Sequence, residues 1–243
     1  MSANDVERSR AYVRLAERFG EVRTLLELCS SPETDSQMRR TVAGKDAALL
    51  RGALVLLCSH LEGFFEELIE DALHAFDLLA PTVAAIPLAI RQKQVTYRLR
   101  LAESADLDRD WRGLLECVAH PLLRDDHPCL PGTRKIDSDL HIKGFANPGT
   151  GEIDRLMASI GVSECWAVVA KKLGGRHGAD TVNAVVNRRN QIAHGNLESS
   201  VARSDVEEYV AVLEMVCGEF DAVVGHHLAS CTGNSDPWGS SLV

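Results

Sequence analysis

Residues 46–80 read DAALLRGALVLLCSHLEGFFEELIEDALHAFDLLA and carry the strongest periodic pattern of the chain. Apolar side chains recur every three or four positions: Leu49, Leu50, Ala53, Leu54, Leu57, Leu61, Phe64, Phe65, Leu68, Ile69, Leu73 and Phe76. Acidic residues occupy the other side: Glu62, Glu66, Glu67, Glu70 and Asp71. This spacing predicts one long core helix with a solvated acidic face, ended by Pro81.

Helical spacing marks further segments on both sides of this stretch. We expect helices over 4–29, 83–104, 108–119, 151–160, 162–173, 179–194 and 204–228. Ser204 and Glu207 form a capping-box pattern at the start of the last helix. The chain has few aromatic residues, and its core is rich in Leu, Ala and Val, a composition that favours packed helices. The fold class predicted is therefore all-α.

The domain prediction is a single helical bundle over residues 1–229. Residues 120–150, rich in Pro, Gly and charge, predict a long inserted loop with a short extended piece at 139–145. Residues 230–243 predict a disordered tail. His226 and His227 are expected on the surface of the last helix.

The charge balance of the 243 residues is acidic, at −9 with 35 Asp and Glu against 26 Lys and Arg. A global positive field for nucleic acid is therefore absent. Residues 171–203 differ, because they hold two acidic residues and six basic ones: Lys171, Lys172, Arg176, Arg188, Arg189 and Arg203. The basic charge thus gathers in one segment.

Seven cysteines without a CxxC pair indicate reduced thiols that act as small buried hydrophobes. The polar N-terminus shows no signal peptide, and the longest apolar run, at 53–58, is short for a bilayer. We therefore expect a cytoplasmic protein that does not enter a membrane.

The basic segment contains NRRNQIAHGN at residues 187–196. In a helix, Asn190 and His194 lie about 40° apart on one face; Arg189 is about 140° from His194, but its side chain is long. His194 falls at the helix end, where unpaired carbonyls favour imidazolium while Arg189 opposes it. Such a histidine suits proton transfer, and an adjacent guanidinium suits stabilisation of charge on a phosphate.

The stretch from Arg189 to His194 resembles the R-x4–6-H signature of the HEPN superfamily, and RRNQIAHG looks especially like its RiboL-PSP and toxin-like branches. LLCSHLEGFFEELIE at 56–70 and ANPGTGEIDRLMASIGVS at 146–163 are similar to other parts of that branch. The resemblance covers roughly residues 45–80 and 145–228. It leaves residues 81–145 unmatched, and that segment could set substrate choice.

The resemblance implies an all-α bundle and a metal-independent endoribonuclease without cofactor, whose active site forms between two subunits. Arg189, His194 and Asn190 would be catalytic, and Arg188 and Glu62 would support them; Arg189 is preferred to Arg188 because the family pairs Arg directly with Asn. Lys171, Lys172, Arg176 and Arg203 are candidate RNA or phosphate ligands. The implied partners are an RNA substrate, a second copy, and an antitoxin or inhibitor protein of a toxin or defence effector.

Other interpretations compete with this one. Arg189 and His194 could simply complement a helix C-terminus. Cys117, His120, His127 and Cys129 have zinc-ligand chemistry but match no standard zinc spacing, and Asp71 with His74 matches only half of a di-iron pattern. Residues 174–178, GGRHG, could bind phosphate or form a plain turn. A non-catalytic HEPN module that binds nucleotide or RNA, or serves as a scaffold, is the alternative function.

Overall fold

The computed structural model describes residues 7–29, 39–104, 122, 136–174, 177–195 and 201–239. Within these ranges the secondary structure is helical and contains no strand, so the all-α prediction is confirmed. The helices are α1 (Arg10–Glu27), α2 (Arg39–Leu79), the 3₁₀ helix η1 (Val83–Ala85), α3 (Leu88–Ser104), α5 (Asp139–Ile142), α6 (Thr150–Ala158), α7 (Cys165–Lys172), α8 (Gly178–Ala193) and α9 (Arg203–Thr232).

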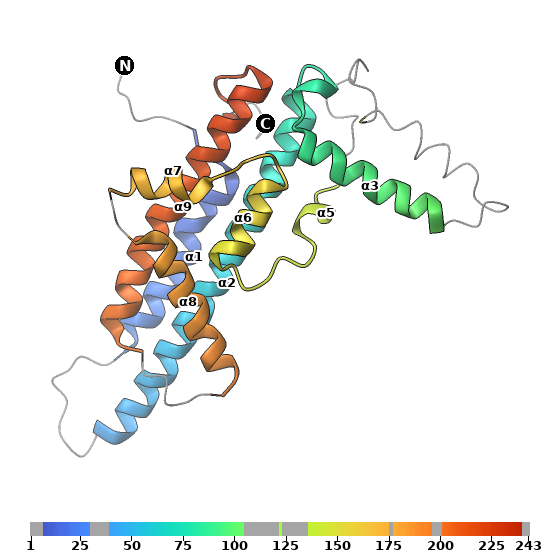
Figure 1. The fold of residues 1–243 in the computed structure, drawn as a ribbon. Coiled ribbons are helices and arrows are strands. Elements are labelled where there is room, and N and C mark those ends of the chain that lie inside the picture. The colour runs from blue at the N-terminus through green and yellow to red at the C-terminus, as the bar shows by residue number, and fades with distance from the viewer. Residues whose placement is uncertain are drawn as a thin grey trace, which may run out of the picture.

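The long helix predicted around residues 46–80 is α2, and it forms the centre of the molecule. It packs against α1, α8 and α9, as Figure 1 shows. Its apolar face is fully buried at Leu57, Leu61, Phe64 and Phe65. Phe65 meets Phe220 of α9 edge to face, with ring centroids 5.1 Å apart. The hydrophobic pattern therefore places α2 in the core because its broad apolar face needs covering from several sides.

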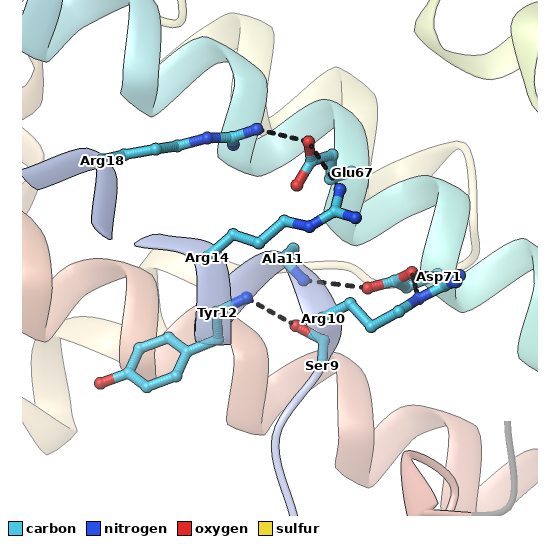
Figure 2. Close-up of polar contacts among 8 residues, drawn as sticks. All are labelled: Ser9, Arg10, Ala11, Tyr12, Arg14, Arg18, Glu67 and Asp71. Carbon is cyan, nitrogen blue, oxygen red and sulfur yellow. Dashed lines mark hydrogen bonds and ion pairs between the residues drawn. The ribbon is translucent and has the colours of Figure 1, made fainter. Parts of the chain in front are cut away.

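The first turn of α1 is fixed by side chains from two other helices. Asp71 of α2 accepts a hydrogen bond from the backbone N–H of Ala11 at 3.0 Å and pairs with Arg10 (Figure 2). Ser9 caps Tyr12 through its hydroxyl, while Asp221 of α9 accepts from the N–H of Ser9. The prediction of a solvated Asp71 is therefore wrong: its side chain is buried because it satisfies a helix N-terminus.

The helix α3 leaves the bundle, and Figure 1 shows its C-terminal half running away from α2. Its buried Gln94 donates to the backbone carbonyl of Asp137 and accepts from the N–H of the same residue. Residues 139–145 were expected to be extended, but they contain the short helix α5. We call residues 136–149 the strap, because they connect α3 to the rest of the bundle.

Three predictions near the C-terminus are wrong. Ala202, not a serine, is the N-cap of α9, and Arg203 pairs with Glu207, so the expected capping box does not form. The tail expected to be disordered is ordered through residue 239, because Trp238 is buried against Gly225. His227 is half-buried, and its Nε2 lies 3.0 Å from the carbonyl oxygen of Ile160.

The predictions for the cysteines and for residues 108–119 have different outcomes. Cys29, Cys58, Cys165 and Cys217 are buried as free thiols, as predicted, whereas Cys231 is partly exposed. The helix expected over 108–119 lies outside the described residues. By length and composition α2 passes the test for a membrane-spanning helix, as buried core helices of globular proteins also do.

Candidate functional site at the end of α8

The helix α8 carries the basic motif and is held to the core by one face. Val182, Val185 and Val186 are buried, and the helix packs against α2 and α9. It ends at Ala193, because Gly195 adopts φ +79°, a left-handed conformation that favours glycine. His194 and Gly195 close the last turn through hydrogen bonds to the carbonyls of Asn190 and Ile192. The motif residues therefore lie at the surface, where the helix ends.

The guanidinium of Arg189 is held by two amide oxygens. Its Nη1 donates to Oδ1 of Asn147 at 2.5 Å and to Oδ1 of Asn190 at 3.1 Å. The backbone N–H of Asn147 in turn donates to a carboxylate oxygen of Glu62 at 3.4 Å. Glu62, Asn147, Arg189 and Asn190 thus form one connected polar cluster from α2, the strap and α8. We call these four residues the arginine cluster.

Asn147 belongs to this cluster but escaped the sequence prediction. It has φ +54°, a left-handed conformation that asparagine tolerates better than most residues. The Asn147-Pro148 dipeptide signals a turn, yet nothing in the sequence links it to Arg189, 42 positions away. Only the folded chain brings the two together.

A second asparagine holds Thr150, the first residue of α6 directly after the strap, to α8 about two turns before the motif. Asn183 accepts hydrogen bonds through Oδ1 from the backbone N–H of Thr150 at 3.1 Å and from its hydroxyl at 3.3 Å. Trp166 of α7 donates to the carbonyl of Thr150 at 3.2 Å. These contacts set the end of the strap along α8 and so help to place Asn147 beside Arg189.

His194 is exposed, and no hydrogen bond to its imidazole occurs among the described residues. It is the C-cap residue of α8, at the helix end where the last backbone carbonyls have no partner within the helix. Among the described residues, therefore, Arg189 is held in place by side chains, whereas the exposed imidazole of His194 is not.

Arg188 contacts α9, unlike its neighbour Arg189, which belongs to the arginine cluster. It forms an ion pair with Asp205 of α9 at 2.7 Å and lies over the ring of Tyr209, with 5.8 Å between the guanidinium carbon and the ring centroid. These contacts tie α8 to α9. The supporting role predicted for Arg188 is thus accompanied by an evident packing role.

Two of the four expected phosphate ligands, Lys171 and Lys172, lie at the other end of α8 from His194. Lys171 and Lys172 end α7, next to the start of α8, and His194 follows the 16 residues of α8, about 24 Å along the helix from its start. Lys172 pairs with Glu219 at 3.2 Å. Arg203 pairs with Glu207 and borders a hollow of about 290 Å³ next to α1. Arg176 lies outside the described residues.

The arginine cluster also acts on a buried thiol. Burial raises the pKa of Cys58 to about 11; the positive charge of Arg189 opposes this shift, and the negative charge of Glu62 adds to it. A thiol with this pKa stays protonated at neutral pH and is a poor nucleophile. Cys58 therefore contributes packing rather than chemistry.

No group of three or more His, Cys, Asp and Glu side chains gathers as a metal site in the described part of the chain. The four candidate zinc ligands Cys117, His120, His127 and Cys129 all lie outside it. Asp71, half of the di-iron pattern, is engaged with α1 instead.

Comparison with known protein families gives a match that covers most of the chain. The sequence pattern of the RiboL-PSP-HEPN family matches residues 14–226. The chain belongs to the RiboL-PSP-HEPN family. No curated protein and no solved structure matches it significantly. The family match confirms the resemblance drawn from the motif and indicates a nuclease or RNA-related function in general. It also covers residues 81–145, which the resemblance alone had left unmatched.

Proposed function

We propose that this RiboL-PSP-HEPN protein is a metal-independent endoribonuclease whose active site forms when two α8 ends meet. The observation that carries the proposal is the arginine cluster: Arg189 is held at the surface by Asn147 and Asn190, five positions before the exposed His194. A fixed guanidinium and an exposed imidazole at the same end of α8 supply the two groups needed for charge stabilisation and proton transfer.

The chemistry follows from these two groups. The 2′-hydroxyl of a ribose attacks the adjacent phosphorus and gives its proton to one imidazole. The 5′-oxygen leaves and takes a proton from a second imidazole, supplied by the other chain. The guanidinium neutralises charge that grows on the phosphate oxygens. The products are a 2′,3′-cyclic phosphate and a 5′-hydroxyl.

The contacts of Asn147 and Glu62 support this assignment. A guanidinium on a helix surface that merely complemented the helix end would need no partners from α2 and the strap. Here Asn147 adopts a left-handed backbone conformation and lies within hydrogen-bond distance of Arg189. Such a conformation costs about 1–2 kcal/mol for an ordinary residue, and the hydrogen bond between Asn147 and Arg189 helps to offset that cost.

The test is RNA cleavage in EDTA by the purified full chain. We expect Arg189→Ala and His194→Ala each to lower the cleavage rate at least about 100-fold. Matched controls are His177→Ala, an exposed histidine at the other end of α8, and Arg14→Ala, an exposed arginine of α1. Both controls should cleave like the unchanged protein. Equal activity in all four variants would contradict the proposal.

A second candidate function is an RNA-binding or nucleotide-binding module without catalysis. The observation that favours it is the imidazole of His194, which no described residue orients. Fluorescence anisotropy with labelled RNA distinguishes the two functions. Binding without cleavage, at concentrations where the protein is dimeric, would select the module.

A cellular role as a toxin or defence effector belongs to the same proposal. RNA cleavage is damaging to the cell, so an active enzyme of this kind needs an inhibitor protein or a triggering signal. We expect that expression of the unchanged chain inhibits growth and that His194→Ala does not. Growth inhibition by both would show that the effect is not RNA cleavage.

A further inference from the structure

The helix α3 stands out by its charge. Its 17 residues include one acidic residue, Glu103, and four basic ones, Arg91, Lys93, Arg98 and Arg100. The whole chain has a net charge of −9, so a positive helix runs against the general balance. A local concentration of basic charge on an acidic protein indicates a surface for a polyanion.

The two halves of α3 have different surroundings. Ile90 and Gln94 in the first half are fully buried. In the second half Tyr97 is 39% exposed and Leu99 is 46% exposed, and Arg100 is also exposed. Figure 1 shows this half extending away from the bundle. The first half therefore anchors the helix, and the second leaves several side chains exposed.

The basic side chains of this second half have no carboxylate partner among the described residues. Ion pairs engage eight other arginines: Arg8, Arg10, Arg14, Arg18, Arg23, Arg155, Arg188 and Arg203. Arg98 and Arg100 are in none of these pairs. Arg98 and Arg100 therefore add positive charge to a protruding helix, with no carboxylate partner in the part of the chain that the structure describes.

The strap connects α3 to the proposed active site. At one end Gln94 binds Asp137, and Lys93 donates to the backbone carbonyl of His141. At the other end Asn147 binds Arg189. A strand of RNA bound at the end of α8 could therefore continue along the strap toward α3.

We propose that α3 is an RNA-binding arm for the single-stranded substrate of this enzyme, a proposal that rests on the function proposed above. Arg98 and Arg100 neutralise phosphates, and Tyr97 stacks on a base between them. Guanidinium groups bind phosphate through charge-assisted hydrogen bonds, and an aromatic ring accepts any base. A second copy of the chain fits less well, because two α3 helices brought together by symmetry would repel.

The experiment uses the full chain with His194→Ala, which binds RNA without cutting it. Binding of a fluorescein-labelled 20-nucleotide oligouridine is measured by anisotropy at several KCl concentrations. The added pair Arg98→Gln and Arg100→Gln should lower the slope of log K against log[KCl] by about 1.4, since each phosphate contact on a single strand contributes about 0.7. Added Tyr97→Ala should weaken binding at least about fivefold at fixed salt.

Two matched variants separate charge from structure. The pair Arg14→Gln and Arg23→Gln removes the same charge from α1, which packs against α2 and α9, and should leave the salt slope unchanged. The pair Arg98→Lys and Arg100→Lys keeps the charge and should keep the slope. The proposal is overturned if Arg98→Gln with Arg100→Gln leaves the salt slope unchanged. It is also overturned if Arg14→Gln with Arg23→Gln lowers the slope equally.

The oligomeric state gives a further outcome. If the glutamine pair on α3 turns a dimer into a monomer in sedimentation velocity, α3 binds a second copy and the proposal is overturned. If oligouridine binds to the His194→Ala protein and the α3 substitutions do not change this binding, the RNA-binding role of α3 is overturned but the proposed nuclease function is not. If the unchanged chain neither binds nor cleaves RNA, the proposed function itself fails.

Discussion

At the scale of single residues, Asn147 decides how Arg189 is presented. A free arginine at a helix end samples many rotamers, and ordering it costs up to about 2 kcal/mol. The amide oxygens of Asn147 and Asn190 restrict the guanidinium before any ligand binds. Asn147 is thus a positioning residue, because it acts through Arg189 rather than on the substrate.

Substitution of Asn147 tests this role. We expect Asn147→Ala to lower kcat/KM about tenfold, because Arg189 loses one of its two restraints. Asn147→Gly lacks the same amide but accepts φ +54° without strain, so it separates the lost contact from backbone strain. Both variants should lose activity equally in an initial-rate assay. If glycine restores full activity, the amide is dispensable.

At the scale of the element, the N-terminus of α1 depends on acceptors from other helices. Three backbone N–H groups, of Ser9, Ala11 and Tyr12, are bound by Asp221, by Asp71 and by the hydroxyl of Ser9 (Figure 2 shows the last two contacts). Because two of the three acceptors lie on α2 and α9, α1 is capped only when the bundle is assembled.

Removal of one acceptor should therefore destabilise the whole bundle. We expect Asp71→Ala to lower the free energy of unfolding by about 1–3 kcal/mol, because the N–H of Ala11 is left buried without a partner. Glu70→Ala, at the exposed neighbouring position, is the control and should change it by less than about 0.5 kcal/mol. Urea unfolding measures both. Similar losses in the two variants would show that Asp71 is not a cap.

The strap contains a buried histidine, His141, that makes the stability of the folded chain depend on pH. Burial first, then the positive charge of Lys93, lowers the pKa of His141 to about 4, and a hydrogen bond with Ser159 opposes this shift. The unfolded chain has the ordinary pKa of about 6.5 and so binds more protons between pH 6.5 and pH 4. Acid in this range therefore favours the unfolded state.

We expect protonation of this histidine in the unfolded chain to lower the free energy of unfolding by about 2 kcal/mol between pH 7 and pH 5. The variant His141→Gln keeps hydrogen-bonding capacity without a charge, so its unfolding free energy should fall less over the same range. Urea unfolding at both pH values gives the difference, and His177→Gln, an exposed histidine, is the control. Parallel pH curves for the unchanged protein and His141→Gln would contradict the assignment.

At the scale of the whole molecule, the proposed reaction uses two imidazoles, and the described part of one chain offers only that of His194 at the end of α8. We expect the cleavage rate per chain to fall on dilution as the dimer dissociates, by mass action. Initial rates over a range of protein concentration, compared with the dimer fraction from sedimentation velocity, test this. A constant rate per chain in fully monomeric protein would require a site within one subunit.

The periodic pattern of residues 46–80 by itself determined the all-α class and the central helix, because a broad apolar face can only be buried by several neighbours. The motif at 187–196 determined the family and the helix end, since glycine stops a helix locally. The tail shows the limit: residues 230–239 were expected to be disordered but are ordered, because Trp238 is buried beside Gly225, a contact that no local pattern reveals.

The tertiary structure alone decided which polar residues meet. Asp71 reads as one carboxylate of a solvated face but caps α1. Asn147 reads as a turn residue but holds Arg189 across 42 positions, while Lys171 and Lys172 are near the motif in sequence but lie at the opposite end of α8. The physical reason is that hydrophobic periodicity depends on neighbours within a helix, whereas polar partners depend on how separate helices are packed.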